Sequence, residues 1–234
     1  MLAIFDIDGT ICDTQAVEGR CYALAIERVT GLSLSTLDWS VYDEPTSAGI
    51  VHQMLAGDAT LKEKEEQIKH EFCRLLRTER PNHPGDFSPL SGAVEFIDRL
   101  QKQGTRVAIA TGAFDIEAQF KLDCCGIDLN AFPHATSSDL PHRSDIIALS
   151  ASRAGFELTS VVYFGDGPWD IKACNKLGIR MIGIGRRYEK LLSLGVQNAF
   201  RDYSEPDEIM NALAQPGTKA PNKALQATCE DARA

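Results

Sequence analysis

The chain has 234 residues, of which 44% are hydrophobic and 24% are charged, a composition that fits a globular protein and excludes a disordered or fibrous one. Its formal net charge of −9 disfavours general binding to nucleic acid or to a membrane surface, because phosphate groups would be repelled on average. No stretch approaches the roughly 20 apolar residues of a membrane span, and the N-terminus lacks the basic start of a signal peptide. We therefore expect a cytoplasmic protein; the sequence leaves the choice between monomer and homodimer undetermined.

Four short apolar runs, each followed by a polar or Gly-rich turn and a longer amphipathic segment, are typical of buried parallel strands. The segments that follow them carry apolar residues at helical spacing. This alternation predicts an α/β fold, with a Rossmann-like parallel sheet flanked by helices. The expected strands lie within residues 2–8, 106–112, 160–167 and 180–185, and the expected core helices within residues 93–103, 144–154 and 170–177.

The interval between the first two expected strands has no convincing strand but three helical patterns, at residues 16–29, 47–55 and 61–78. A Pro- and Gly-rich stretch at residues 80–89 is typical of a hinge and ends the interval. We interpret the interval as a small α-helical cap inserted into the core. Its charge run, residues 62–71, is typical of a solvated helix face.

These patterns predict how the chain divides into domains. The α/β core is expected to comprise residues 1–14 and 89–214, with the helical cap formed by residues 15–88. The last residues, 215–234, are rich in Pro, Ala and polar side chains with weak periodicity, and are expected to be disordered and to add nothing to the core.

Polar side chains follow three of the expected strands at the point where each strand ends. Because the carboxyl ends of parallel strands meet at one edge of a sheet, we expect these side chains to converge there. Carboxylates crowded together need a counter-charge, and oxygen-only ligands select Mg²⁺. The residues are Asp6 and Asp8 after the first strand, Thr111 and Gly112 after the second, and Asp166 and Asp170 after the third.

The Asp-x-Asp spacing suits chemistry at phosphorus. Residues i and i+2 of a strand point to the same side, so the carboxyl groups of Asp6 and Asp8 can address one substrate. One carboxylate can then act as nucleophile while the second moves protons. Gly9 permits a sharp turn, whose backbone N–H groups can hold phosphoryl oxygens.

In that order, these residues resemble the motifs of the haloacid dehalogenase-like superfamily, over about residues 1–190. The stretch DIDGT, Asp6 to Thr10, matches every specified position of its first motif, DxDGT. Thr111 in AIATG matches the second motif, and Asp166 and Asp170 in GDGPWD match the fourth. The third motif usually holds a Lys; here Arg143 in HRSDII takes the position, with Lys121 and His142 as less favoured substitutes.

The resemblance implies a phosphatase with a first-position cap. Asp6 would attack phosphorus and become an aspartyl-phosphate, and Asp8 would be the general acid and base. An acid two residues after the nucleophile distinguishes the phosphatases and phosphomutases of the superfamily from its dehalogenases. Arg143 would neutralise charge and bind the phosphoryl group together with Gly9, Thr10, Thr111 and Gly112. Asp6, the Asp8 backbone carbonyl and Asp166 would hold Mg²⁺, and Asp170 would bind it directly or through water.

The expected partner is a small phosphate ester, such as a sugar phosphate, phosphoglycolate or a nucleotide, with no nucleic acid or membrane partner. Two alternatives stay open: a phosphomutase of the same fold, and a non-catalytic phospho-accepting or binding module, against which the cap and the full motif set count. A phosphonate-cleaving enzyme would need a Schiff-base lysine in the cap, and Lys62, Lys64 and Lys69 all lie in the charged run.

Overall fold

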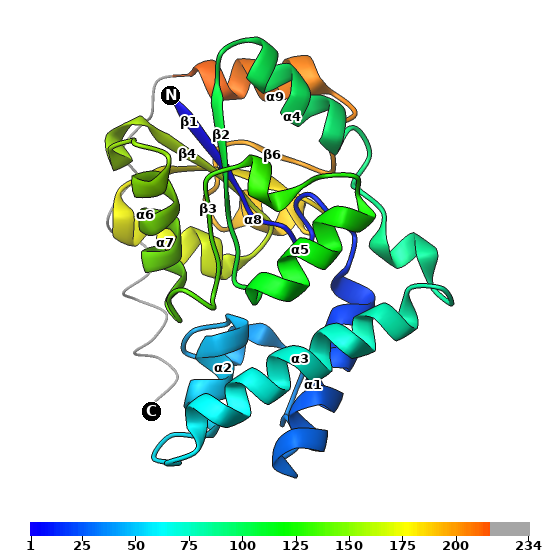
Figure 1. Cartoon of the computed structure of the whole chain (residues 1–234). Coiled ribbons are helices and arrows are strands. Elements are labelled where there is room, and N and C mark those ends of the chain that lie inside the picture. Colours follow the sequence, from blue (N-terminus) through cyan, green and yellow to red (C-terminus); the bar gives the residue numbers. More distant parts are fainter. Residues whose placement is uncertain (216–234) are drawn as a thin grey trace.

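The computed structural model describes residues 1–215, and its centre is one sheet of six parallel strands in the order β3-β2-β1-β4-β5-β6 (Figure 1). The predicted tail, residues 215–234, lies outside the described residues apart from Gln215. The strands are β1 (Leu2–Phe5), β2 (Arg106–Ala110), β3 (His134–Ala135), β4 (Val161–Gly165), β5 (Arg180–Ile184) and β6 (Ala199–Phe200).

The first strand of the chain lies in the middle of the sheet. Phe5 pairs in register with Ile109 of β2 on one side and with Phe164 of β4 on the other. All four residues of β1 are buried, as expected for a strand covered on both faces. The chain builds β2 and β3 to one side and β4 to β6 to the other, so a topological switch point, where ligands bind in such sheets, lies at β1.

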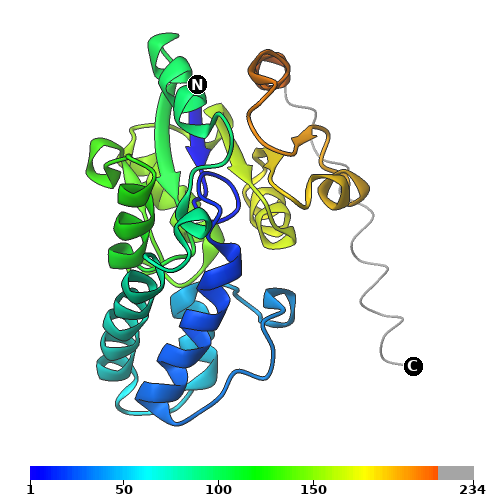
Figure 2. The ribbon, with the colours of Figure 1, turned by 90° about the vertical axis from the view of Figure 1, so that its right-hand side faces the viewer.

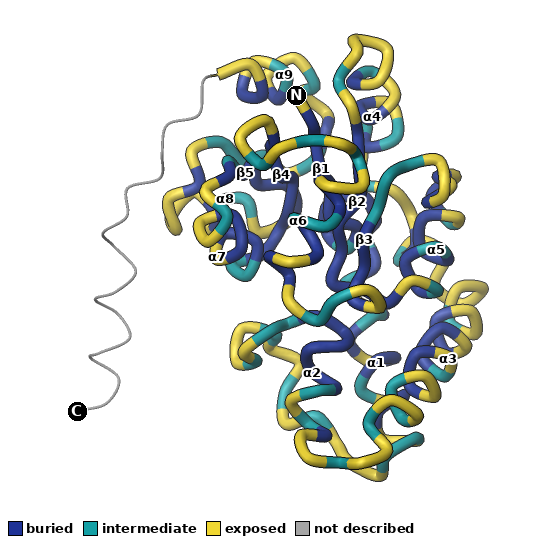
Figure 3. The backbone as a smooth tube through the Cα atoms, turned by 60° about the vertical axis from the view of Figure 1, so that its left-hand side comes forward, coloured by how far each residue is buried: buried dark blue, intermediate teal, exposed yellow. Residues whose placement is uncertain are grey.

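Helices cover both faces of the sheet, because alternate side chains of each strand point to opposite faces. Ala3 and Phe5 face one hydrophobic cluster, whereas Leu2 and Ile4 face another. In Figure 3 the buried residues follow the strands and the inner sides of the helices, while the helix turns that face outward are exposed. The first face carries α4 (Ala93–Lys102), α5 (Asp115–Cys124) and α9 (Pro206–Ala214); the second carries α6 (Arg143–Arg153), α7 (Pro168–Leu177) and α8 (Tyr188–Ser193).

The chain that follows β1 forms three helices that lie together beyond the carboxyl end of β1, before α4 returns to the face of the sheet (Figure 1). Two of them, α1 and α3, run side by side, as Figure 2 shows. Tyr22, Ile26 and Phe72 belong to a third hydrophobic cluster, which also includes Phe114 and Phe120 next to and within α5. This segment comprises α1 (Gln15–Thr30), α2 (Ser47–Met54) and α3 (Leu61–Glu79), with 3-10 turns at Trp39–Val41 and Pro84–Phe87.

The predicted elements agree with the structure in type, and differ mainly at the ends. The first expected strand, residues 2–8, stops as a strand at Phe5, because the chain turns through a tight loop from Asp6 onward. The predicted solvated face of residues 62–71 includes one buried lysine, Lys69, which forms ion pairs with Glu66 and Asp115. Within residues 1–215, no helix has the length and apolar character needed to cross a lipid bilayer.

Candidate active site

The loop after β1 is tightly folded by its own backbone. The N–H groups of Thr10, Ile11 and Cys12 all donate to the carbonyl oxygen of Ile7, at 3.2, 2.8 and 2.9 Å. Gly9 has φ of 74°, and a Cβ built there would lie 2.5 Å from a carboxylate oxygen of Asp166. Only a glycine therefore lets the loop approach β4 so closely while it turns.

Three buried carboxylates meet at the ends of β1 and β4. Asp6, Asp166 and Asp170 each offer one oxygen such that these atoms lie within 4.8 Å of one another. Burial raises the pKa of Asp6 to about 6 and that of Asp166 well above its ordinary value, and Asp170 nearby adds to both shifts. Such a cluster of like charges can hold a hard divalent cation through oxygen ligands alone.

Arg143, the first residue of α6, supplies positive charge to these acids. One terminal nitrogen of its guanidinium lies 3.0 Å from Asp6 and 3.0 Å from Asp170. Burial opposes the charge of Arg143, but the two carboxylates outweigh that effect and raise its pKa further. A Cβ at Gly112 would collide with this guanidinium, so the glycine leaves the space that Arg143 fills. His142, the neighbouring candidate, is exposed and faces Glu44 at 3.4 Å instead.

Asp170 accepts hydrogen bonds from protein donors at both of its carboxylate oxygens. One of its oxygens accepts from Arg143 and from the hydroxyl of Tyr163, at 3.0 and 3.3 Å. The other accepts from the backbone N–H groups of Asp166 and Gly167, at 3.1 and 2.9 Å. Asp170 thus fixes both Arg143 and the loop that carries Asp166, in addition to any contact with a cation.

The residues predicted to hold a phosphoryl group fall into two sets. Thr111 and Gly112 line a cavity at the sheet edge, together with Asp6 and Arg143. Gly9 and Thr10 do not line it: their N–H groups donate to Cys12 and Ile7 within the loop, at 2.8 and 3.2 Å. The Thr10 hydroxyl is buried without a hydrogen-bond partner among the described residues. Gly9 and Thr10 therefore shape the loop, and their backbone donors are already used.

Asp8 points to a different environment from Asp6. Its carboxylate is not part of the trio of acids found among residues 1–215. It accepts a hydrogen bond from the Thr14 hydroxyl and lies 2.8 Å from the ammonium group of Lys121 on α5. That ammonium is also 2.8 Å from Glu18 of α1 and 3.4 Å from Glu117 of α5. We call Lys121, Asp8, Glu18 and Glu117 the lysine cluster.

The lysine cluster was missed by the sequence analysis, which treated Lys121 only as a less favoured substitute for Arg143. Lys121 is completely buried, and the three carboxylates raise its pKa although burial opposes its charge. Burial also raises the pKa of Glu18 to about 7 and that of Glu117 to about 8. The one readable signal was the spacing of Glu117 and Lys121, which places them on the same helix face.

A cavity of about 180 Å³ connects the core acids with the helical segment that covers them. The helical segment is hydrogen-bonded directly to the core, because the N–H of Ser47, at the start of α2, donates to the Gly112 carbonyl at 2.7 Å. The core contributes Asp6, Asp8, Thr111, Gly112, Arg143 and Asp166 to the lining, and the segment between β1 and β2 contributes Glu18, Arg20, Tyr22, Trp39, Ser47 and Ile50, among others.

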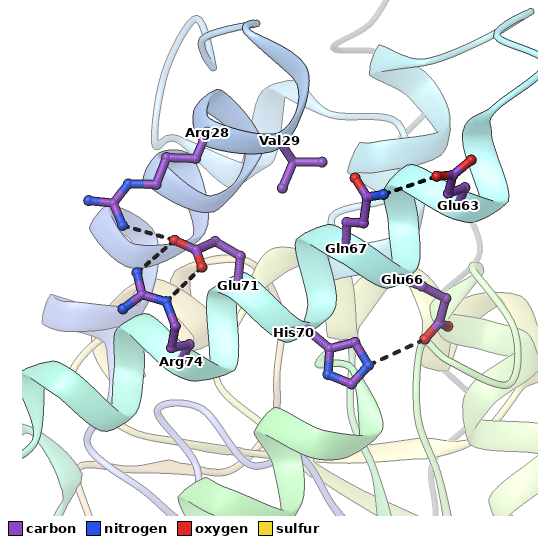
Figure 4. A pocket seen from close by; sticks show the side chains of 8 residues that line it. All are labelled: Arg28, Val29, Glu63, Glu66, Gln67, His70, Glu71 and Arg74. Atoms are coloured by element: carbon purple, nitrogen blue, oxygen red, sulfur yellow. Dashed lines mark hydrogen bonds and ion pairs between the residues drawn. The ribbon is translucent and has the colours of Figure 1, made fainter.

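A larger hollow, of about 670 Å³, lies along α1 and α3 (Figure 4). Its charged side chains satisfy one another: Glu71 pairs with Arg28 at 2.9 Å and with Arg74 at 2.7 Å, and Glu63 accepts from Gln67 at 3.2 Å. None of the strand-end residues lines it. The smaller cavity, which is lined by Asp6, Asp166 and Arg143, is therefore the candidate active site.

The sequence model of the haloacid dehalogenase-like hydrolase family matches residues 3–184. The chain belongs to this family. A phosphoglycolate phosphatase from Agrobacterium fabrum is 26% identical over 220 residues, which cover 91% of this chain and 89% of the relative. Among solved structures, a hydrolase from Pseudomonas syringae has a TM-score of 0.72 at 19% identity, covering 91% of this chain and 99% of that one. CbbY from Rhodobacter sphaeroides, in complex with phosphate, has a TM-score of 0.68 at 15% identity, covering 87% and 95%.

These comparisons confirm three predictions: the family, the α/β fold with its parallel sheet, and a phosphatase of this family as the enzyme class. The proposal for the residue roles, the cation and the substrate rests on the side chains around the cavity.

Proposed function

We propose that the protein is a Mg²⁺-dependent phosphohydrolase that cleaves a small phosphomonoester through a phosphorylated Asp6. The observation that carries this proposal is the buried Asp6 carboxylate, which lies 3.0 Å from Arg143 and beside two further acids at the end of the central strand. A carboxylate beside a fixed cation, at the edge of a cavity, suits nucleophilic attack on an anionic phosphoryl group.

The cation fits the donors that are present. Carboxylates of Asp6, Asp166 and Asp170, with the backbone carbonyl of Asp8, would hold Mg²⁺ through oxygen atoms alone. Burial raises the pKa values of Asp6 and Asp166, and a divalent cation would offset that cost by favouring the ionised forms. When bound, Mg²⁺ supplies positive charge that neutralises the phosphoryl oxygens.

The side chains then divide the reaction between two steps. In the first, a carboxylate oxygen of Asp6 bonds to phosphorus, the ester P–O bond breaks, and Asp8 gives its proton to the leaving oxygen. In the second, Asp8 takes a proton from water as the water oxygen bonds to phosphorus, so that inorganic phosphate leaves and Asp6 is regenerated. Arg143 balances the charge of Asp6 and the phosphoryl group throughout, and Thr111 and Gly112 bind phosphoryl oxygens.

Residues 15–88 act in this proposal as a cap that excludes water and selects the leaving group. The support is their share of the cavity lining and the hydrogen bond from Ser47 to Gly112. A cavity of about 180 Å³ suits a small leaving group. We propose a cytoplasmic metabolite as substrate, and phosphoglycolate, named for the Agrobacterium fabrum relative, is the first ester to test.

The test is a phosphate-release screen over small phosphate esters, with and without Mg²⁺, comparing the wild type with Asp6→Asn. We expect phosphate release that depends on both Mg²⁺ and Asp6. Asp13→Asn is the matched control, because Asp13 belongs to the same loop but pairs with Arg186 and does not line the cavity. Absence of Asp6-dependent phosphate across a broad panel would contradict the proposal, and an isomerised ester without free phosphate would indicate a mutase.

A further inference from the structure

Asp6 and Asp8, the two acids of the DIDGT stretch after β1, each have a buried cation. Asp6 is paired with Arg143, which the family motif predicts, whereas Asp8 is paired with Lys121, which no motif assigns. Lys121 has no exposed side-chain surface and does not line the cavity, while Asp8 and Glu18, two of its three partners, do line it. The ammonium group therefore lies directly behind the cavity wall.

We propose that Lys121 is a positioning residue for the phosphatase reaction: its ammonium group holds the Asp8 carboxylate in the orientation from which Asp8 exchanges a proton with the leaving oxygen. This inference rests on the proposed function, because it assigns Lys121 a role through the proton transfer by Asp8.

The geometry gives Asp8 two fixed points. The Thr14 hydroxyl donates to one oxygen of its carboxylate, and the Lys121 ammonium lies 2.8 Å from both oxygens. A carboxylate held at both oxygens keeps one orientation, which matters because misplacement of a reacting group by about 1 Å costs on the order of 10²-fold in rate.

Lys121 is itself held in place by contacts from two sides. A lysine ammonium has three N–H donors, and three carboxylates surround this one: Asp8, Glu18 from α1 and Glu117 from the preceding turn of α5. The Phe72 ring of α3 lies 5.8 Å away on the side of the cap helices. With every donor engaged, the lysine has no alternative partner to which it can swing. The Asp8 contact is thereby made rigid.

The chain offers a matched lysine for comparison. Lys69 of α3 is also nearly buried. It pairs with Glu66 of its own helix at 2.8 Å and joins α3 to α5 through Asp115 at 3.4 Å. Its partners do not line the cavity. Lys69 therefore represents a buried lysine with a purely structural role between these helices, whereas Lys121 is the lysine proposed to position Asp8.

The experiment compares two esters that differ in their need for a proton. An alkyl phosphate needs Asp8 to protonate its leaving oxygen, whereas 4-nitrophenyl phosphate releases a stable phenolate. In Lys121→Met we expect kcat/KM for the alkyl phosphate to fall about 10- to 100-fold more than that for 4-nitrophenyl phosphate. Since Asp8 also activates water in the second step, kcat for 4-nitrophenyl phosphate should fall and phosphorylated Asp6 should accumulate, detected by mass in acid-quenched samples.

The controls separate positioning from folding. Lys69→Met is expected to lower the thermal unfolding temperature but to keep the wild-type ratio of kcat/KM between the two esters. Lys121→Arg, which retains a positive charge, is expected to recover part of the alkyl phosphate activity. If Lys121→Met does not fold, the paired replacement Lys121→Met/Glu117→Met removes a buried acid with the buried cation and carries the same measurement.

A fall by the same factor for both esters in Lys121→Met, as in Lys69→Met, would overturn the inference while the proposed function stood. If the wild type releases no Asp6-dependent phosphate from either ester, the proposed function fails first and the inference falls with it.

Discussion

The two buried cations of this site differ in what they join. The guanidinium of Arg143 contacts Asp6, Asp170 and the hydroxyl of Tyr163, so its partners all belong to the core. Lys121 contacts Asp8 and Glu117 but also Glu18, which comes from the first helix after the loop. The surroundings of the nucleophile are thus built within the sheet edge, whereas those of the acid and base depend on a helix of the cap.

This difference separates two functions of one short loop. In the proposed reaction the fixed positive charge of Arg143 beside Asp6 serves both steps, and among residues 1–215 its guanidinium forms no ion pair or hydrogen bond with a side chain of the cap helices. In the proposed reaction Asp8 gives a proton in the first step and takes one in the second, and its cation is bridged to α1, the helix that lines the cavity. We therefore predict that replacing Arg143 mainly lowers the stability of the protein without substrate. Replacing Asp8 or Lys121 should mainly lower the rate of turnover.

The largest expected effect is that of Asp8→Asn. We expect kcat to fall about 10²- to 10⁴-fold, because general acid–base catalysis supplies an effect of that size. The Asp8 carboxylate is outside the trio of acids that would hold Mg²⁺, so stabilisation of the variant by Mg²⁺ should match that of the wild type. Steady-state kinetics measure the fall in kcat, and thermal unfolding with and without Mg²⁺ measures the stabilisation by the cation. Turnover near the wild-type rate would remove Asp8 from its role.

Arg143→Met should instead act mainly on stability. It leaves the buried Asp6 and Asp170 without their cation, and breaking such a buried pair costs about 3–5 kcal/mol. For a chain of this size each kcal/mol lowers the unfolding temperature by about 2–4 °C. Mg²⁺ should restore part of that loss, since a cation replaces the missing charge, and Arg143→Lys should lose less. An unfolding temperature equal to that of the wild type in the absence of Mg²⁺ would contradict the assignment.

The smallest expected effect is that of Glu117→Gln on the pH dependence of stability. Burial raises the pKa of Glu117 from its ordinary 4.5 to about 8 in the folded protein. Between pH 4.5 and about pH 8 the folded protein keeps a proton on Glu117 that the unfolded chain has lost. The stabilising contribution of this proton is therefore complete below pH 4.5, and it is lost as the pH rises through about 8. Unfolding temperatures measured between about pH 5 and about pH 9 should fall less in the variant than in the wild type.

A surface glutamate serves as the control for that measurement. Glu157 is exposed, and Glu157→Gln is expected to follow the wild-type curve. If Glu117→Gln and the wild type lose stability in parallel over this range, the proton of Glu117 is not kept on folding and the buried charges are balanced in another way.

Most of the core could be predicted from the sequence because its signals are local. The four longer strands fall within the expected apolar runs, and the three cap helices lie within a residue or two of the predicted ranges. The edge strands β3 and β6 were missed, since each has two residues and no periodic pattern can be recognised in so short a segment. Their place at the sheet edges depends on pairing with β2 and β5.

The candidate site divides in the same way. That Asp6, Asp166 and Arg143 come together follows from strand direction and motif order, both readable in the sequence. The use of the Gly9 and Thr10 amides within the loop was not readable, because the sequence shows a sharp turn but not which acceptors the turn presents.

The sequence by itself determined the strand ends, the acids that follow them and hence the chemistry available, because β-strand and helix periodicity and chain direction are properties of neighbouring residues. Only the tertiary structure decided that Lys121 lies behind Asp8 with Glu18 and Glu117 around it. Those side chains come from a loop and two helices far apart in the chain. Their meeting depends on how α1 and α5 both pack against α3, which no local pattern encodes.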